Sequence, residues 1–214
     1  MDACIEDEED DEKILSQVLK NYNKQLLPNK LGTETTVEIH VSDIPSLSEM
    51  KSEFSLDLMY SEMWQDSRLN YANQSIYCDT PSNITLNVDF LDIIWTPNTC
   101  IVNSKAASIH ASPSPNLFLI LYENGNVWKN CRMVVRAPCE IDLRKFPFDQ
   151  QKCVLIFESY SFNSNKVRLQ WLEAAPITLL KNVELPDFTL VDMTAKHFVI
   201  PYPNGLWDQL EVLI

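Results

Sequence analysis

Apolar and polar residues alternate along most of the chain after residue 36. Polar residues separate Val37, Ile39 and Val41, and the same period of two continues from Phe54 up to Trp64. A period of two is typical of a strand with one buried face, because successive side chains of a strand point to opposite faces. The pattern predicts strands here and over residues 84–95, 117–122, 127–136, 153–160, 167–172, 188–200 and 207–214.

Two Asn-Gly pairs mark tight turns between these strands. Asn124-Gly125 connects the strands predicted over 117–122 and 127–136, and Asn204-Gly205 connects the last two. Short strands with turn signals at this spacing predict an all-β fold, an immunoglobulin-like β-sandwich of about ten strands.

The period changes near the N-terminus. Residues 1–12 contain eight acids and no base, which predicts a disordered acidic tail. We therefore expect a tail over 1–12 and one domain over 13–214. The domain begins with an amphipathic α-helix that ends before Pro28, because apolar residues recur there at helical spacing: Ile14, Leu15, Val18, Leu19, Tyr22 and Leu26.

Charge and composition exclude several classes of function. The net charge of −13 comes largely from the acidic tail, and no basic patch is present to neutralise phosphates, so we expect no nucleic-acid partner. With three glycines in the chain, a glycine-rich phosphate loop is nearly excluded. The three histidines lack metal-ligand spacing, and no hydrolase or protease motif is present. We expect no enzyme, no metal and no cofactor.

Signals for the membrane and the secretory pathway are mixed. The longest apolar run, Leu117–Leu121, is far shorter than the roughly 20 residues that span a bilayer, and the N-terminus lacks a secretory signal. Sequons begin at Asn73 and Asn83, and both are candidate glycosylation sites if the chain is extracellular, although chance sequons are common.

One segment enclosed by two cysteines has a spacing that can be compared with a known family signature. CEIDLRKFPFDQQKC, residues 139–153, places thirteen residues between its cysteines and resembles the signature of the Cys-loop pentameric ligand-gated ion channels. Glu158-Ser159-Tyr160 resembles their invertebrate anion-channel branch, chloride channels gated by GABA, amines or acetylcholine. The resemblance covers about residues 12–214, with further motifs in the family's order: WQDSRL (64–69), IIWTPN (93–98, with Asn98 where the family usually has aspartate), FESYSFNS (157–164) and YPNGLW (202–207).

The resemblance implies that Cys139 and Cys153 form a disulfide, which contributes about 3 kcal/mol in the chain-entropy model. In the family this loop presses on the membrane domain, which would give a partner to the apolar tip Phe146-Pro147-Phe148-Asp149. The alternative is that one or both phenylalanines fold back onto the sandwich. A Cys100–Cys131 bridge is conceivable, and the pairing of the other cysteines stays open: Cys4, Cys78, Cys100 and Cys131.

The resemblance also implies an agonist site between neighbouring subunits, where each aromatic face attracts an ammonium group by roughly 0.5–2 kcal/mol. Cys100 and Val102 stand where relatives tend to place a tyrosine, so one wall lacks its aromatic residue. On the principal face we expect a central aromatic residue, a carboxylate for the amine and two rings that cap the ligand: Tyr160, Glu158, Tyr202 and Trp207, respectively.

The complementary face is expected on two other strands. Met59 and Ser61 point towards the site, and Trp128, Asn130 and Arg132 share one face of the opposite strand. In glutamate- and GABA-gated relatives an arginine at the position of Ser61 pairs with the ligand carboxylate, and serine cannot replace that bond. An amine or choline ester is therefore favoured, while Arg132 keeps GABA and glutamate open. Trp128 would supply the aromatic ring that Met59 does not.

We therefore expect the extracellular ligand-binding domain of a receptor subunit at the outer face of the plasma membrane. Its partners would be a small-molecule neurotransmitter and the other subunits of a pentamer, with the membrane reached only through a transmembrane domain absent from this chain. The last strand stops in mid-pattern at Ile214, which favours a truncated subunit. The alternative is a soluble ligand sink related to the acetylcholine-binding proteins, secreted if it is a natural short form. A carbohydrate-binding sandwich would not explain the Cys-loop spacing.

Overall fold

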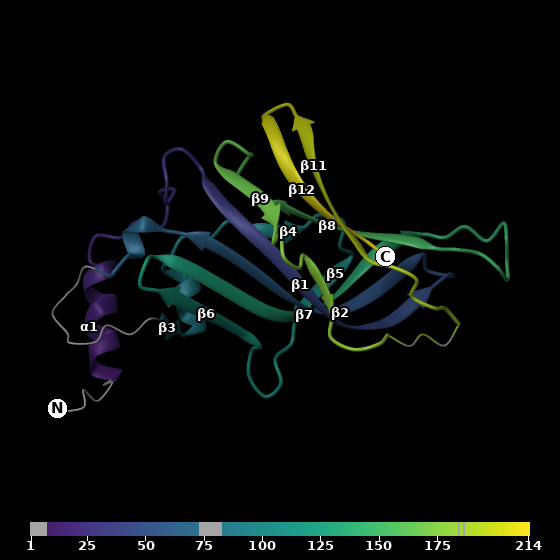
Figure 1. The fold of residues 1–214 in the computed structure, drawn as a ribbon, viewed down its shortest axis with the longest axis horizontal. Coiled ribbons are helices and arrows are strands. Elements are labelled where there is room, and N and C mark those ends of the chain that lie inside the picture. Colours follow the sequence, from purple (N-terminus) through teal and green to yellow (C-terminus); the bar gives the residue numbers. More distant parts are fainter. Residues whose placement is uncertain (1–7, 73–82, 184, 186) are drawn as a thin grey trace.

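The computed structural model describes residues 8–72, 83–183, 185 and 187–214 (Figure 1). Over this part of the chain the elements are α1 (Glu8–Leu19), β1 (Thr33–Ser48), β2 (Glu53–Gln65), the 3-10 helix η1 (Ser67–Leu69), β3 (Asn83–Leu86), the 3-10 helix η2 (Val88–Asp92), β4 (Thr99–Ile101), β5 (Ala106–Ile109), β6 (Leu117–Tyr122), β7 (Asn126–Glu140), β8 (Lys152–Ser159), β9 (Val167–Trp171), β10 (Ile177–Leu179), β11 (Thr194–Tyr202) and β12 (Gly205–Leu213).

The strands form two layers that are joined at the Cys-loop, residues 139–153. The first layer runs β10–β1–β2–β7, with β9 also on β1 and with β5 and β6 on β7, while β3 pairs with β6. The second layer runs β4–β8–β12–β11, and its last two strands form the yellow hairpin that projects from the body in Figure 1. β7 and β8 pair through Cys139–Cys153 and Glu140–Lys152, so each layer supplies one arm of the Cys-loop.

The core lies between the two layers and explains the alternation in the sequence. Leu56, Leu58 and Tyr60 of β2 point inward and are buried. The ring of Tyr60 stacks on that of Phe157 from β8, with centroids 5.4 Å apart. The prediction of an all-β sandwich with an N-terminal helix is confirmed, and the described residues contain 12 strands, close to the expected ten.

Several predicted boundaries are wrong. The strand expected over 84–95 ends at Leu86, because the Asn87 side chain accepts a hydrogen bond from the Val88 backbone N–H and caps a 3-10 helix. The strand expected from residue 188 begins at Thr194. The helix includes residues 8–12, which were expected to be disordered, and it ends at Leu19 rather than near Pro28.

Both predicted Asn-Gly hairpins are confirmed. Gly125 and Gly205 have φ angles of +83° and +130°, which L-residues rarely adopt. A Cβ atom on Gly125 would also lie 2.4 Å from the backbone oxygen of Asp66. The β6–β7 turn can therefore approach the chain after β2 only because its residue is glycine.

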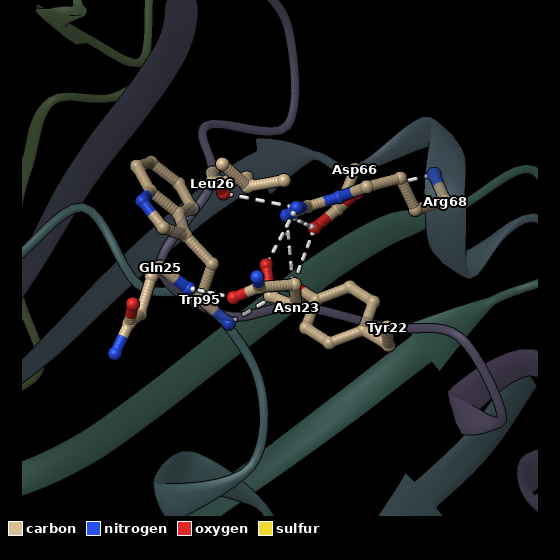
Figure 2. Close-up of polar contacts among 7 residues, drawn as sticks. All are labelled: Tyr22, Asn23, Gln25, Leu26, Asp66, Arg68 and Trp95. Atoms are coloured by element: carbon tan, nitrogen blue, oxygen red, sulfur yellow. Dashed lines mark hydrogen bonds and ion pairs between the residues drawn. The ribbon is translucent and has the colours of Figure 1, made fainter.

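A buried carboxylate ties the segment after the helix to the sandwich (Figure 2). Asp66 accepts hydrogen bonds from the Tyr22 hydroxyl at 2.7 Å and from Nε and Nη2 of Arg68 at 2.8 and 2.7 Å. Arg68 Nη1 donates in turn to the carbonyls of Asn23 and Leu26, at 3.0 and 2.9 Å. Burial, and then the bond to Asp66, raises the pKa of Tyr22. This network holds Tyr22 and Leu26 outside the helix in which they were expected.

Candidate ligand-binding site

One pocket of about 680 Å³ opens beside the β11–β12 hairpin. β8 lies between β4 and β12, and Glu158 is paired with Cys100 on one side and with Gln209 on the other. The ladder therefore brings the end of β8 against the hairpin. The four residues expected on the principal face all line this pocket, whose lining is Cys100, Ile101, Val102, Glu158, Tyr160, Tyr202, Pro203, Asn204 and Trp207.

Glu158 supplies the negative charge of the pocket. Its side chain is only 9% exposed, and its Oε2 atom accepts a 2.6 Å hydrogen bond from Gln209 Nε2. The same amide nitrogen lies 3.3 Å from the Tyr202 hydroxyl. Within the described part of the chain no basic side chain pairs with this carboxylate, so its charge is held in place but not neutralised.

The aromatic residues of the pocket differ in exposure and in the contacts of their rings. The Trp207 ring is buried, donates from Nε1 to Asn204 Oδ1 at 3.0 Å and meets the Tyr202 ring edge to face, with centroids 6.2 Å apart. Tyr160 is 76% exposed, although its backbone N–H is fixed on the carbonyl of Asn98 at 2.9 Å. Trp207 thus forms a buried wall of the pocket held by two contacts, whereas the Tyr160 ring lies exposed at its edge.

The wall that was expected to lack an aromatic residue consists of Cys100 and Val102. Burial, and then the nearby Glu158 charge, raises the pKa of the Cys100 thiol. Cys100 and Cys131 are both free thiols, so the conceivable bridge between them is not formed. Cys4 and Cys78 lie outside the described residues.

The five residues expected on the complementary face share the outer face of β2 and β7. In the β2–β7 ladder Met59 pairs with Arg132, and Ser61 pairs with Asn130. Trp128 pairs with Met63. Paired residues of an antiparallel ladder point to the same side. None of the five lines the pocket beside the hairpin, so the residues expected on the principal face and those expected on the complementary face lie on different layers of the chain.

Three of these residues, Ser61, Asn130 and Trp128, make side-chain contacts within the chain. Ser61 is fully buried, and its hydroxyl accepts a 2.6 Å hydrogen bond from Asn130 Nδ2. Trp128 meets the ring of Phe118 edge to face, with centroids 5.2 Å apart. Phe118 was not among the predicted site residues, although the Asn-Gly turn sets the register that places it opposite Asn130.

Arg132 already has a partner on this face. Its Nε and Nη2 atoms donate to Oδ1 and Oδ2 of Asp57, at 3.1 and 2.7 Å. His110 Nε2 lies 3.4 Å from the same Oδ1 atom. The bond to Arg132 lowers the pKa of Asp57. Asp57 was also missed, although its spacing of two from Met59 places it in the same row.

The Cys-loop has the predicted bridge. The Cys139 and Cys153 sulfurs are 1.98 Å apart, and the disulfide is confirmed. Phe146 and Phe148 at the tip are 69% and 87% exposed, so neither ring folds back onto the sandwich. Asp149 accepts a hydrogen bond from the Gln151 side chain. The loop presents an apolar tip, with Pro147 between the two rings.

Other expectations concern the surface and the membrane. The sequon residue Asn83 is exposed at the start of β3, whereas Asn73 lies outside the described residues. Among the helices of the described residues, none is long and apolar enough to cross a membrane.

Comparison with known proteins identifies the family. Residues 11–210 match the model of the neurotransmitter-gated ion-channel ligand binding domain. Three similar proteins of Caenorhabditis elegans are ligand-gated ion channel 50, the serotonin-gated chloride channel mod-1 and the acetylcholine-gated chloride channel subunit acc-1, which are 50%, 46% and 41% identical. The matches cover 94%, 98% and 99% of this chain but only 40%, 42% and 44% of these relatives. The chain belongs to the ligand-binding domains of the Cys-loop ion channels, a non-enzymatic family, and to its invertebrate branch.

Proposed function

We propose that the pocket beside the β11–β12 hairpin binds a neurotransmitter with an ammonium group, an amine or a choline ester. The observation that carries this proposal is the buried Glu158 carboxylate, which is hydrogen-bonded but not neutralised and lies among the rings of Tyr160, Tyr202 and Trp207. In a full subunit, ligand binding here would open an anion channel at the outer face of the plasma membrane.

The charges favour a cationic ligand. A buried carboxylate without a basic partner is costly, and an ammonium group would supply the missing charge. Aromatic faces attract the same group by roughly 0.5–2 kcal/mol each. A carboxylate ligand would need a base as well, and Arg132 is already paired with Asp57. The names of two relatives, gated by serotonin and by acetylcholine, agree with an amine or a choline ester.

A second chain would complete the site. The pocket lacks the row of Met59, Asn130 and Trp128, which lies on the outer face of the other layer. If the subunits form a ring, the pocket of one chain meets this row of the next. A pentamer arranged in this way is part of the proposal.

The Cys-loop would carry the signal. Phe146 and Phe148 are exposed at the end of a loop that is closed by the disulfide, and a soluble ligand sink would be expected to have polar residues there. Contact of this tip with a membrane domain of the full subunit would link the ligand pocket to the pore.

Thermal unfolding of the oxidised chain with each of four ligands tests the ligand class. The ligands are serotonin, acetylcholine, GABA and glutamate, and sedimentation of the same samples establishes whether the chains assemble. A ligand at 100 times its dissociation constant stabilises the folded state by about 2.7 kcal/mol. We expect stabilisation by serotonin or acetylcholine. Stabilisation by GABA or glutamate alone, or no stabilisation of an assembled sample, would contradict the proposal.

A further inference from the structure

We propose that Asp57 determines which ligands the complementary face accepts, by holding Arg132 in an ion pair so that no free base faces a ligand carboxylate. The inference rests on the proposed function, because it concerns the ligand class of the same interface. It identifies Asp57 as a specificity determinant, although Asp57 was not among the residues expected to contact the ligand.

Two hydrogen bonds join Arg132 to both carboxylate oxygens of Asp57. The guanidinium of Arg132 uses two of its nitrogens, Nε at 3.1 Å and Nη2 at 2.7 Å, on the two different oxygens of Asp57. This bidentate arrangement is the one by which arginine recognises a free carboxylate. Asp57 therefore occupies the Nε–Nη2 edge of the guanidinium and neutralises its charge, which removes the excess positive charge that would attract a ligand carboxylate.

Burial makes this pairing difficult to exchange. Asp57 is only 9% exposed, whereas the Arg132 side chain is half-exposed at the surface. A ligand carboxylate that captured Arg132 would remove both guanidinium hydrogen bonds from the buried Asp57 and leave it beside the His110 ring alone, which is unfavourable. The lowered pKa of Asp57 keeps the carboxylate charged at neutral pH. The ligand would gain one carboxylate–guanidinium pair only by breaking another.

The other basic residues near Arg132 are also next to acids, so none of them replaces Arg132 as a partner for a ligand carboxylate. On β1, the residues opposite Ser61 and Met59 are Glu38 and His40, and these two lie 3.6 Å apart as an acid and a base. The Nε2 atom of His110 lies 3.4 Å from Oδ1 of Asp57 itself. Among the described residues around this row, each base is therefore next to an acid.

Two variants separate the charge of Asp57 from its shape. Asp57→Asn keeps the size of the side chain but cannot neutralise Arg132, so the guanidinium becomes available. The probes are GABA and butylamine, which share the ammonium group and the carbon chain and differ in the carboxylate. We expect the ratio of GABA to butylamine affinity, measured by calorimetry on the assembled chain, to rise about tenfold or more in Asp57→Asn. The added change Arg132→Gln should abolish this gain.

The single variant Arg132→Gln provides an independent test that does not depend on the folding of Asp57→Asn. Because Arg132 is engaged by Asp57 in the native chain, its loss should not lower the ratio of GABA to butylamine affinity. A tenfold fall would show that Arg132 already binds the ligand carboxylate and would overturn the inference. An unchanged ratio in folded Asp57→Asn, or a gain that persists in the double variant, would also overturn it.

The same titrations distinguish this inference from the proposed function. Binding of serotonin or acetylcholine to the native chain tests the ammonium pocket, whereas the GABA to butylamine ratio across the variants tests Asp57. A native chain that binds amines but shows no change of ratio in Asp57→Asn would retain the proposed function and reject the role of Asp57.

Discussion

The carboxylate of Glu158 accepts a 2.6 Å hydrogen bond from the side-chain amide of Gln209. The two residues are direct partners in the β8–β12 ladder, so the backbone of the second layer fixes their contact. An amide satisfies one carboxylate oxygen without cancelling its charge. The proposed function therefore implies a pocket that is arranged before the ligand arrives, with the positive charge supplied by the ligand.

The exposed ring of Tyr160 should contribute to binding and little to stability. We expect Tyr160→Ala to weaken binding of the stabilising amine about 10-fold, through loss of a cation–π contact. The melting temperature should barely change, because exposed substitutions usually alter stability by less than about 0.5 kcal/mol. Calorimetry and thermal unfolding of the same samples measure both effects.

Tyr160→Phe is the matched control, since it keeps the ring and removes only the hydroxyl. It should retain most of the affinity. Native affinity in Tyr160→Ala would remove this ring from the site.

The disulfide should stabilise the domain independently of the ligand. Replacing Cys139 and Cys153 with serine should lower the free energy of unfolding by about 3 kcal/mol, because the open loop gives the unfolded chain more freedom. Urea unfolding measures the loss. Cys100→Ser, which alters a free thiol, is the control and should have a much smaller effect. Equal midpoints for the native chain and the double variant would contradict this prediction.

A second ion pair joins the partly exposed Lys129 to Glu62, which is fully buried. Lys129 Nζ is 2.7 Å from Oε1 of Glu62, whose other oxygen accepts a 2.9 Å hydrogen bond from the Tyr60 hydroxyl. Burial alone would lower the pKa of Lys129, but the Glu62 carboxylate outweighs it and the pKa is raised. A raised lysine pKa means that this stabilisation is complete at neutral pH and is lost only as the pH rises through the folded-state pKa.

Removing one partner of this pair should be more harmful than removing both. Lys129→Met should cost about 3 kcal/mol or more, because Glu62 is left buried without a counter-charge. The double variant Glu62→Gln/Lys129→Met should recover part of that loss, and a double-mutant cycle from urea unfolding measures the coupling. Additive losses would show that the two side chains do not interact.

The free thiol in the pocket offers a chemical probe. Because the pKa of Cys100 is raised, we expect slow alkylation by iodoacetamide at neutral pH and a rate that rises with pH beyond 9, as the thiolate fraction grows. The stabilising amine should protect it, since Cys100 lines the pocket. Peptide mapping measures both, with Cys131 as an internal control: it is buried, and burial raises its pKa to about 11. Equal labelling with and without the amine would place the ligand elsewhere.

The fold class and the position of the Cys-loop could be predicted from the sequence, because they depend on local pattern and on motif spacing. The alternation around Leu56 and Leu58 identified a sandwich, and the spacing of Cys139 and Cys153 located the Cys-loop. Residues whose role depends on contacts distant in sequence were missed. Asp57 is paired with Arg132, 75 residues away, and the role proposed for it depends on that pair. The helix ends early because Tyr22 bonds to a carboxylate that follows β2, which helical periodicity cannot reveal.

Titration of Glu158→Gln with the amine that stabilises the native chain tests the central claim most directly. The variant keeps the shape of the side chain and removes its charge. Hydrogen bonds to charged groups contribute about 1.5–3 kcal/mol, so the affinity should fall at least about tenfold. Glu173→Gln, which neutralises an exposed glutamate away from the pocket, should bind as the native chain does. Native affinity in Glu158→Gln would contradict the claim that this carboxylate receives the ammonium group.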